Sequence, residues 1–249
     1  MANKTRTDIK NQIYQYLPQI NQTAKATLVN NCIDLAVEDI SNRHNFRSLR
    51  ASTPDTATLA AAAYSLNLSD FTTMGGSTGY FKEVLSMFRL QAGKEDHAPV
   101  RFVDDIDFHQ TYGYVDYTSA QTGAPSYYTY IATKFLFNCP ADKSYTIRVW
   151  YQTYHPPFAA DGTSHSFDTR DNMVAFQAIV HRSLIELKNS LSSGEFPMDL
   201  QAIGQLSEGY ISQLIQRDVE RTLQNEDFEL GVLERSSRRA TDENPYSWV

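Results

Sequence analysis

The sequence predicts an α+β fold with three parts: a helical bundle built from the N- and C-terminal helices, an inserted antiparallel β-rich lobe, and an extended C-terminal tail. Apolar residues recur every three or four positions near both ends of the chain, but alternate with polar residues in the middle. The 249 residues can bury a core without disulfides or a structural metal. We assign the bundle to residues 1–55 and 165–225, the β-rich domain to 56–160, and the tail to 226–249.

Two helices are predicted in the first part of the bundle. Ile9 and Ile13 lie four residues apart and indicate a short helix that ends before Pro18. A longer amphipathic helix follows, with Asn21 or Thr23 as its N-cap. Its apolar stripe comprises Val29, Ile33, Ala36 and Ile40.

The middle block changes to the period of two that is typical of half-buried strands. We expect strands at 64–68, 80–90, 127–131, 134–138 and 144–154. Residues 126–154 are interpreted as an antiparallel meander, in which Pro140 and Asp142 form the last connection. A short helix is expected to start near Asp104.

The second part of the bundle contains two further helices. Met173, Phe176 and Val180 begin the stripe of a strong helix over 170–191, with Asp168 or Thr169 as its cap. Another helix is predicted over 198–224. Beyond it the chain turns polar and cannot bury a face, so it is expected to be disordered or docked on a partner.

Composition and charge exclude several classes of protein. The formal net charge of −7 argues against a basic protein that wraps nucleic acid. Cys32 and Cys139 lie far apart, give neither a disulfide framework nor zinc spacing, and fit a reducing compartment. We interpret both as small apolar fillers. The sequence contains no run of about 18 apolar residues, so no membrane span is predicted.

The sequence offers one cluster with the ingredients of a metal site. Asp104, Asp105, Asp107 and His109 could bind a divalent ion, which would favour a metal-dependent nuclease or hydrolase. The other interpretation is that the acids cap a short helix. The six histidines lack ligand spacing, and His181 is interpreted as structural. No phosphate loop or dinucleotide motif occurs, so no cofactor is expected.

The aromatic residues and the C-terminal tail bear on partners. Aromatic residues crowd the 127–154 strands and fit sheet packing, a subunit interface, or stacking on single-stranded nucleic acid. The tail combines arginines with terminal aromatic residues, which are typical interface anchors. The proposed docking residues are Arg235, Arg238, Arg239, Pro245, Tyr246, Trp248 and Val249.

The order of these features resembles that of the head-to-tail adaptor proteins of tailed bacteriophages, also called connector or head-completion proteins. An early helix, a strand-rich insert, a pair of long helices and a polar tail follow one another in the same order. The local motifs that carry the resemblance are Gly123, Pro125, Tyr128, Pro140, Asp142, Tyr145 and Tyr151, with Pro156 or Pro157.

The resemblance implies a structural virion protein, not an enzyme, that forms a commonly twelvefold ring at the head–tail junction. Its implied partners are the portal protein, a tail or nozzle protein, and other copies of itself. The helical bundle would line a channel through which genomic DNA passes without specific binding, and the C-terminal tail would reach into the portal. The metal-dependent enzyme and another kind of tail structural protein remain the alternatives.

Overall fold

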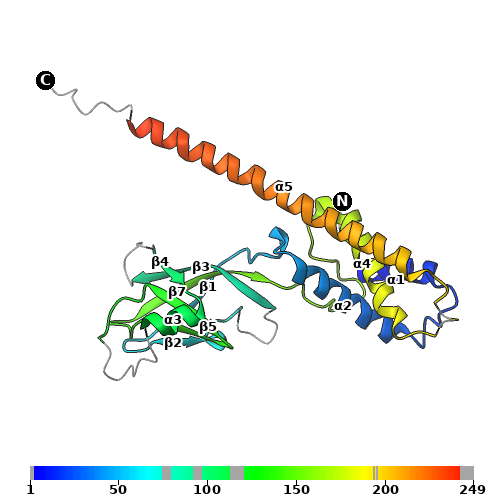
Figure 1. Cartoon of the computed structure of the whole chain (residues 1–249), viewed down its shortest axis with the longest axis horizontal. Coiled ribbons are helices and arrows are strands. Elements are labelled where there is room, and N and C mark those ends of the chain that lie inside the picture. The colour runs from blue at the N-terminus through cyan, green and yellow to red at the C-terminus, as the bar shows by residue number, and fades with distance from the viewer. Residues whose placement is uncertain are drawn as a thin grey trace. The chain divides into compact units, whose positions relative to one another are not determined.

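In the computed structural model the chain divides into two compact units (Figure 1). The structure describes residues 3–74, 80–91, 97–112, 121–192, 194 and 196–241, with side chains as far as residue 222 except those of residues 91 and 97. The helical unit comprises Met1–Ser48 and Pro157–Val249, and the β unit comprises Leu49–Pro156. The mixed α+β class predicted from the sequence is confirmed.

The helical unit is built from segments at both ends of the chain. Its elements are α1 (Arg6–Tyr16), α2 (Ala26–Arg43), η3 (Thr169–Asp171), α4 (Asn172–Lys188) and α5 (Leu200–Thr241), and the short turn η1 (Arg47–Leu49) follows α2 at the boundary between the units. A capping box of Thr5 and Asp8 starts α1. The predicted N-cap of α2 is wrong, because the helix begins after Lys25. Asn21 instead accepts a hydrogen bond from the Ala24 N–H at 3.0 Å, which forms a turn ahead of the helix.

Helix α4 lies at the centre of the helical unit and packs against α1, α2 and α5. His181 on α4 is buried, and its ring centroid lies 5.8 Å from that of Tyr16 and 5.2 Å from that of Tyr210. Its Nδ1 donates to the Gln177 carbonyl at 2.8 Å. The imidazole therefore joins three helices, as expected of a structural histidine.

Helix α5 is longer than the 198–224 helix predicted from the sequence. It continues to Thr241 and so includes residues 226–241, which we had assigned to the extended tail. Glutamate, leucine and arginine are frequent in this stretch and have high helix propensity, and the next proline is Pro245. In the part of the chain that the structure describes, no helix is long and apolar enough to cross a membrane.

Seven strands form the sheet of the β unit within the described residues. They are β1 (Asp55–Leu59), β2 (Ser65–Asn67), β3 (Phe81–Gln91), β4 (His97–Phe102), β5 (Tyr127–Ile131), β6 (Lys134–Phe137) and β7 (Tyr145–Thr153). Their order is β1-β7-β3-β4-β5-β6-β2, and contacts between β1 and β2 make the sheet a nearly closed barrel. Phe135, Phe137 and Ile147 are fully buried inside it. The short helix α3 (Asp105–Tyr112), predicted near Asp104, packs against β5.

The predicted meander over 126–154 is wrong. Strands β5 and β6 form an antiparallel pair, but the other neighbour of β6 is β2 and not β7. Strand β7 instead pairs with β1 and β3. The connection after β6 forms hydrogen bonds with other loops and does not make a tight turn that would pair β7 with β6. The Pro140 carbonyl accepts from the Gly123 N–H at 2.8 Å, and the Ala141 N–H donates to the Ala63 carbonyl at 2.9 Å. The lobe is also not wholly antiparallel, because β4 and β5 run parallel.

Candidate functional site

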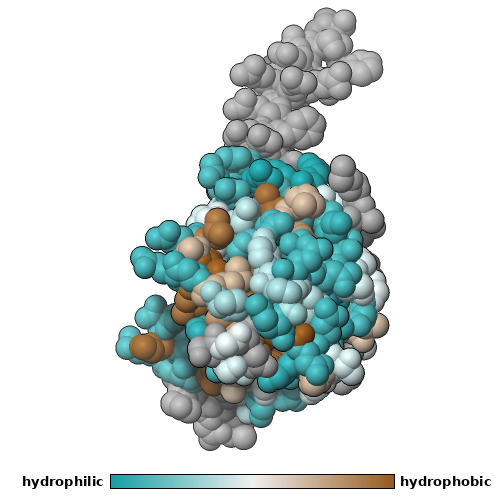
Figure 2. Space-filling model, turned by 90° about the vertical axis from the view of Figure 1, so that its right-hand side faces the viewer, coloured by the Kyte–Doolittle hydropathy of each residue, from teal (hydrophilic) through white to brown (hydrophobic). Residues whose placement is uncertain are grey.

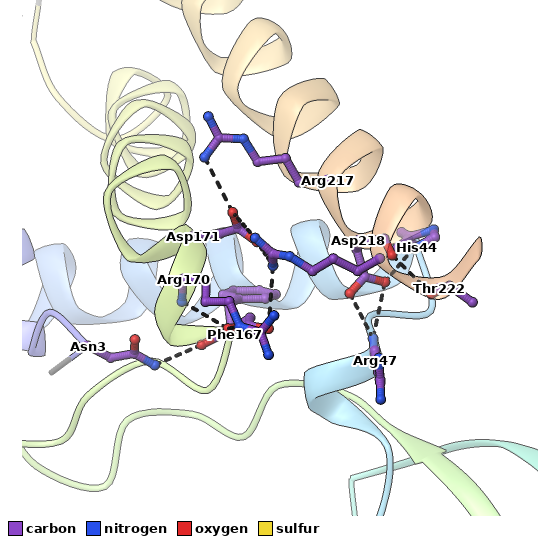
Figure 3. Close-up of polar contacts among 11 residues, drawn as sticks. Asn3, His44, Arg47, Phe167, Arg170, Asp171, Arg217, Asp218 and Thr222 are labelled. Atoms are coloured by element: carbon purple, nitrogen blue, oxygen red, sulfur yellow. Dashed lines mark hydrogen bonds and ion pairs between the residues drawn. The ribbon is translucent and has the colours of Figure 1, made fainter. Parts of the chain in front are cut away.

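A buried carboxylate fixes the long helix α5 to the start of α4 (Figure 3). Asp168 caps η3, because its Oδ1 accepts from the Arg170 N–H at 2.9 Å. This turn places Asp171 at the N-terminus of α4, where its negative charge interacts favourably with the helix dipole. The Asp171 side chain is only 2% exposed and needs compensating charge.

Two arginines on α5 supply that charge. Arg217 and Arg221 are one helical turn apart and therefore share a face. Arg221 Nη2 lies 2.8 Å from Asp171 Oδ1, and its other terminal nitrogen binds Oδ2. Arg217 Nη1 lies 3.3 Å from Oδ1. The hydrogen bond to Asp171 raises the pKa of Arg221, so the guanidinium stays charged.

A second carboxylate ties α5 to the end of α2. Asp218 is buried, and its Oδ2 lies 3.0 Å from His44 Nε2. The backbone N–H of Arg47 donates to the same carboxylate at 3.2 Å. We call these groups the α5 anchor: Asp168, Asp171, Arg217, Asp218, Arg221, His44 and the Arg47 N–H.

The anchor is suited to holding a helix rather than to catalysis. Each carboxylate is occupied by guanidinium, imidazole or backbone donors. From Arg221, α5 continues for about 20 residues, which is about 30 Å at the helical rise of 1.5 Å per residue. The backbone positions of Arg235, Arg238 and Arg239 lie on this extension, but their side chains are outside the described part of the chain. Pro245, Tyr246, Trp248 and Val249 lie outside the described residues altogether.

The acidic residues Asp104, Asp105 and Asp107 lie at the N-terminal end of α3. Asp104 Oδ1 accepts from the Ile106 N–H at 3.0 Å, and Asp105 forms an i,i+4 pair with His109 at 3.0 Å. Asp107 is exposed in the first turn. Across the described residues, histidine, cysteine and acidic side chains nowhere form a group of three or more that could hold a metal ion. The geometry thus favours the capping interpretation of these residues.

Both cysteines are free thiols in sheltered surroundings. Burial, with a smaller contribution from Glu186, raises the pKa of Cys32 to about 11. Burial also raises the pKa of Cys139. Thiols with raised pKa values are protonated at neutral pH and are poor nucleophiles, which agrees with the interpretation of both residues as fillers.

The residues that carry the sequence resemblance build a corner of the barrel. The Tyr145 hydroxyl donates to Asp142 Oδ1 at 2.7 Å, and the Asp142 N–H donates to the Gly123 carbonyl at 3.0 Å. Burial and the Asp142 carboxylate raise the pKa of Tyr145 to about 12. Tyr128 and Tyr151 lie in the barrel core. These motif residues therefore stabilise the barrel.

Comparison with protein families decides the identity of this scaffold. The model described as SU10 adaptor protein matches residues 4–234, which include nearly all of both units. The chain belongs to the SU10 adaptor family. This membership confirms the resemblance to the head-to-tail adaptors of tailed bacteriophages and makes a structural role the family's role. No curated protein matches the SU10 adaptor chain.

The α5 anchor of this SU10 adaptor is the part of the site that local sequence patterns do not reveal. In the sequence, Asp171 looks like an ordinary polar residue at the start of a helix. Asp218 looks like part of a solvent-exposed helix face. The available signal is the four-residue spacing of Arg217 and Arg221, just after the apolar positions Ile211 and Leu214. Such spacing is also common on exposed helices, so only the packing of α5 on α4 distinguishes the two cases.

Proposed function

We propose that the protein is a non-enzymatic virion component whose copies form a ring, of twelve subunits, between the capsid portal and the tail. The family match over residues 4–234 is the observation that carries this proposal. It spans the helical unit and the β unit together, so the proposed role belongs to the whole scaffold and not to one motif.

The proposed ring encloses part of the DNA channel. Each copy contributes a net charge of −7, so the charge of the whole ring is strongly negative. A negatively charged channel wall repels DNA phosphates. Repulsion leaves DNA free to slide, whereas a basic wall would retain it through counterion release. The charge balance therefore supports passage without specific binding.

The helical unit offers exposed apolar side chains for contacts between neighbouring copies. Figure 2 shows a largely hydrophilic face with apolar side chains scattered over part of it. The exposed large apolar residues of this unit are Leu35, Met173, Leu200, Leu206 and Val219. The cores of subunit interfaces are more apolar than the rest of a protein surface, so we propose that these positions contact neighbouring copies in the ring.

The C-terminal segment is proposed to dock on the portal. The α5 anchor fixes the base of α5, and the helix ends at Thr241, about 30 Å beyond Arg221. Arg235, Arg238 and Arg239, followed by Tyr246 and Trp248, are residue types that dominate binding energy at interfaces. The docking set also includes Pro245 and Val249. The β unit is then left to contact the tail or nozzle protein.

Truncation of the chain tests the docking. We expect deletion of residues 242–249 to abolish co-sedimentation with the portal protein, because it removes the aromatic anchors and leaves α5 intact. The matched control is Glu208→Ala, which changes an exposed residue of the same helix. Undiminished binding of the truncated chain would remove Pro245, Tyr246, Trp248 and Val249 from the docking set and leave only the arginines of α5.

A further inference from the structure

The β unit carries an arginine without a partner on the outside of its barrel. Ile147 and Val149 of β7 belong to the barrel core, so Arg148 and Trp150, which alternate with them, lie on the outer face. Within the part of the chain that the structure describes, the Arg148 side chain forms no hydrogen bond or ion pair, and its Nε is shielded from water. A shielded donor without an acceptor is costly, so this guanidinium would gain from an acceptor outside the chain.

The outward positions around Arg148 carry no charge. Arg148 lies opposite Thr56 of β1 and Phe88 of β3, and Trp150 lies opposite Ser86. Trp150 is 36% exposed although it is a large apolar side chain. Arginine and tryptophan are residue types that dominate binding energy at interfaces. We call this surface the Arg148 face: Thr56, Ser86, Phe88, Thr146, Arg148 and Trp150.

Helix α3 presents a surface of the opposite charge. The helix lies on the outer face of β5, where Tyr112 stacks on Tyr127 with ring centroids 5.9 Å apart. Ile106 in its first turn is 67% exposed. Asp107 follows it, is also exposed, and forms no hydrogen bond or ion pair in the described part of the chain. The start of α3 therefore combines an exposed apolar side chain with an unpaired carboxylate.

The strand order places the two surfaces on different sides of the barrel. Strands β3 and β4 separate β7 from β5 in one direction, and β1, β2 and β6 separate them in the other. One copy can therefore use its Arg148 face and its α3 at the same time, each toward a different neighbour. A contact of this head-to-tail kind repeats from copy to copy and can close into a ring.

Charge complementarity favours a second copy of the chain as the occupant of the Arg148 face. Copies of net charge −7 repel one another, so contact is easiest where an unpaired cation of one copy meets an unpaired carboxylate of the next. Nucleic acid fits this face less well, because binding a phosphate backbone takes several cations. Arg148 is the only cation among the residues of the face.

We propose that the Arg148 face receives helix α3 of a second copy, with Asp107 paired to Arg148 and Ile106 packed against Trp150. Charge-assisted pairing gives the contact its orientation, and the two apolar side chains lose exposed surface together. The closure of these contacts into a ring rests on the proposed function, whereas the pairing of two copies does not.

A charge swap tests the contact in the full chain. Sedimentation velocity at low ionic strength measures self-association, since salt screens exposed charges. Arg148→Glu and Asp107→Arg each bring like charges together, and each is expected to weaken self-association by roughly tenfold or more. An equimolar mixture of the two variants should restore it, because the new glutamate of one variant meets the new arginine of the other.

Other variants separate the contact from the rest of the barrel. Lys134→Glu is the matched control, because it makes the same change of charge at an exposed residue of β6 outside both surfaces. It is expected to leave self-association unchanged, whereas Trp150→Ala and Ile106→Ala should weaken it. Unchanged melting temperatures show that the variants fold.

Four results would overturn the proposal. The parent chain could stay monomeric at about 1 mM, which is the weak end of specific affinities. Arg148→Glu could associate as strongly as Lys134→Glu, or the mixture no better than its two components. A single-stranded oligonucleotide could bind the parent and lose binding in Arg148→Glu, which would assign the face to nucleic acid. None of these results bears on portal docking, so they are distinguishable from failure of the proposed function.

Discussion

Replacing Arg221 with alanine breaks the α5 anchor at its best-paired contact. The Asp171 carboxylate, 2% exposed, would then keep only Arg217, whose Nη1 lies 3.3 Å away and whose side chain is 46% exposed. Removing one partner of a fully buried ion pair costs about 3–5 kcal/mol, because the other charge stays buried. Arg221 is itself 21% exposed and Arg217 remains, so we expect a loss of about 2–3 kcal/mol.

Urea unfolding followed by circular dichroism at the helical minimum measures this loss. Glu208→Ala is the control on the same helix, because Glu208 pairs with Arg43 in a 55% exposed position and should cost about 1 kcal/mol or less. Added salt should reduce the small effect of the control and leave that of Arg221→Ala nearly unchanged. Equal losses in the two variants would refute the idea that Asp171 fixes α5.

Two further predictions concern titration and reactivity. Burial raises the pKa of Asp55, but backbone donors led by the Met74 N–H outweigh it, so the folded pKa lies below its usual value. Its stabilising contribution is therefore present above about pH 4 and lost as pH falls through the folded pKa. Urea unfolding can be followed by Trp150 fluorescence in a Trp248→Phe background. The unfolding midpoint of Asp55→Asn should approach that of the parent as the pH falls, and a difference between the two midpoints that stays constant with pH contradicts this. Cys32, with a pKa of about 11, should resist iodoacetamide at pH 8 until urea unfolds the chain. Rapid labelling of Cys32 itself in the folded protein, measured in a Cys139→Ser background, would disprove its burial.

Local periodicity predicts the elements whose burial follows a single face. Helices α2 and α4 carry long apolar stripes, and both were predicted. Strands β1 and β4 were not predicted, because β1 contains only Ala57 and Leu59 as apolar positions and β4 contains Pro99. Proline lacks the N–H of a ladder and argues against a strand.

Long-range pairing is what local patterns cannot supply. Strand β7 was predicted as a strand, but its neighbours are β1 and β3, which lie far earlier in the chain. The α5 anchor depends in the same way on packing, since Asp171 and Arg221 are charged residues of the kind that normally face solvent. The family resemblance, by contrast, was accessible from sequence because it rests on the order of the elements and on short local motifs. Asp142 and Tyr145, three residues apart and joined by a hydrogen bond, belong to one of these motifs.

Electron microscopy of the full chain mixed with purified portal protein tests the central claim most directly. The proposed adaptor role predicts closed rings with twelvefold symmetry attached to the portal. Particles that stay monomeric beside the portal, or that assemble into open filaments, would contradict it.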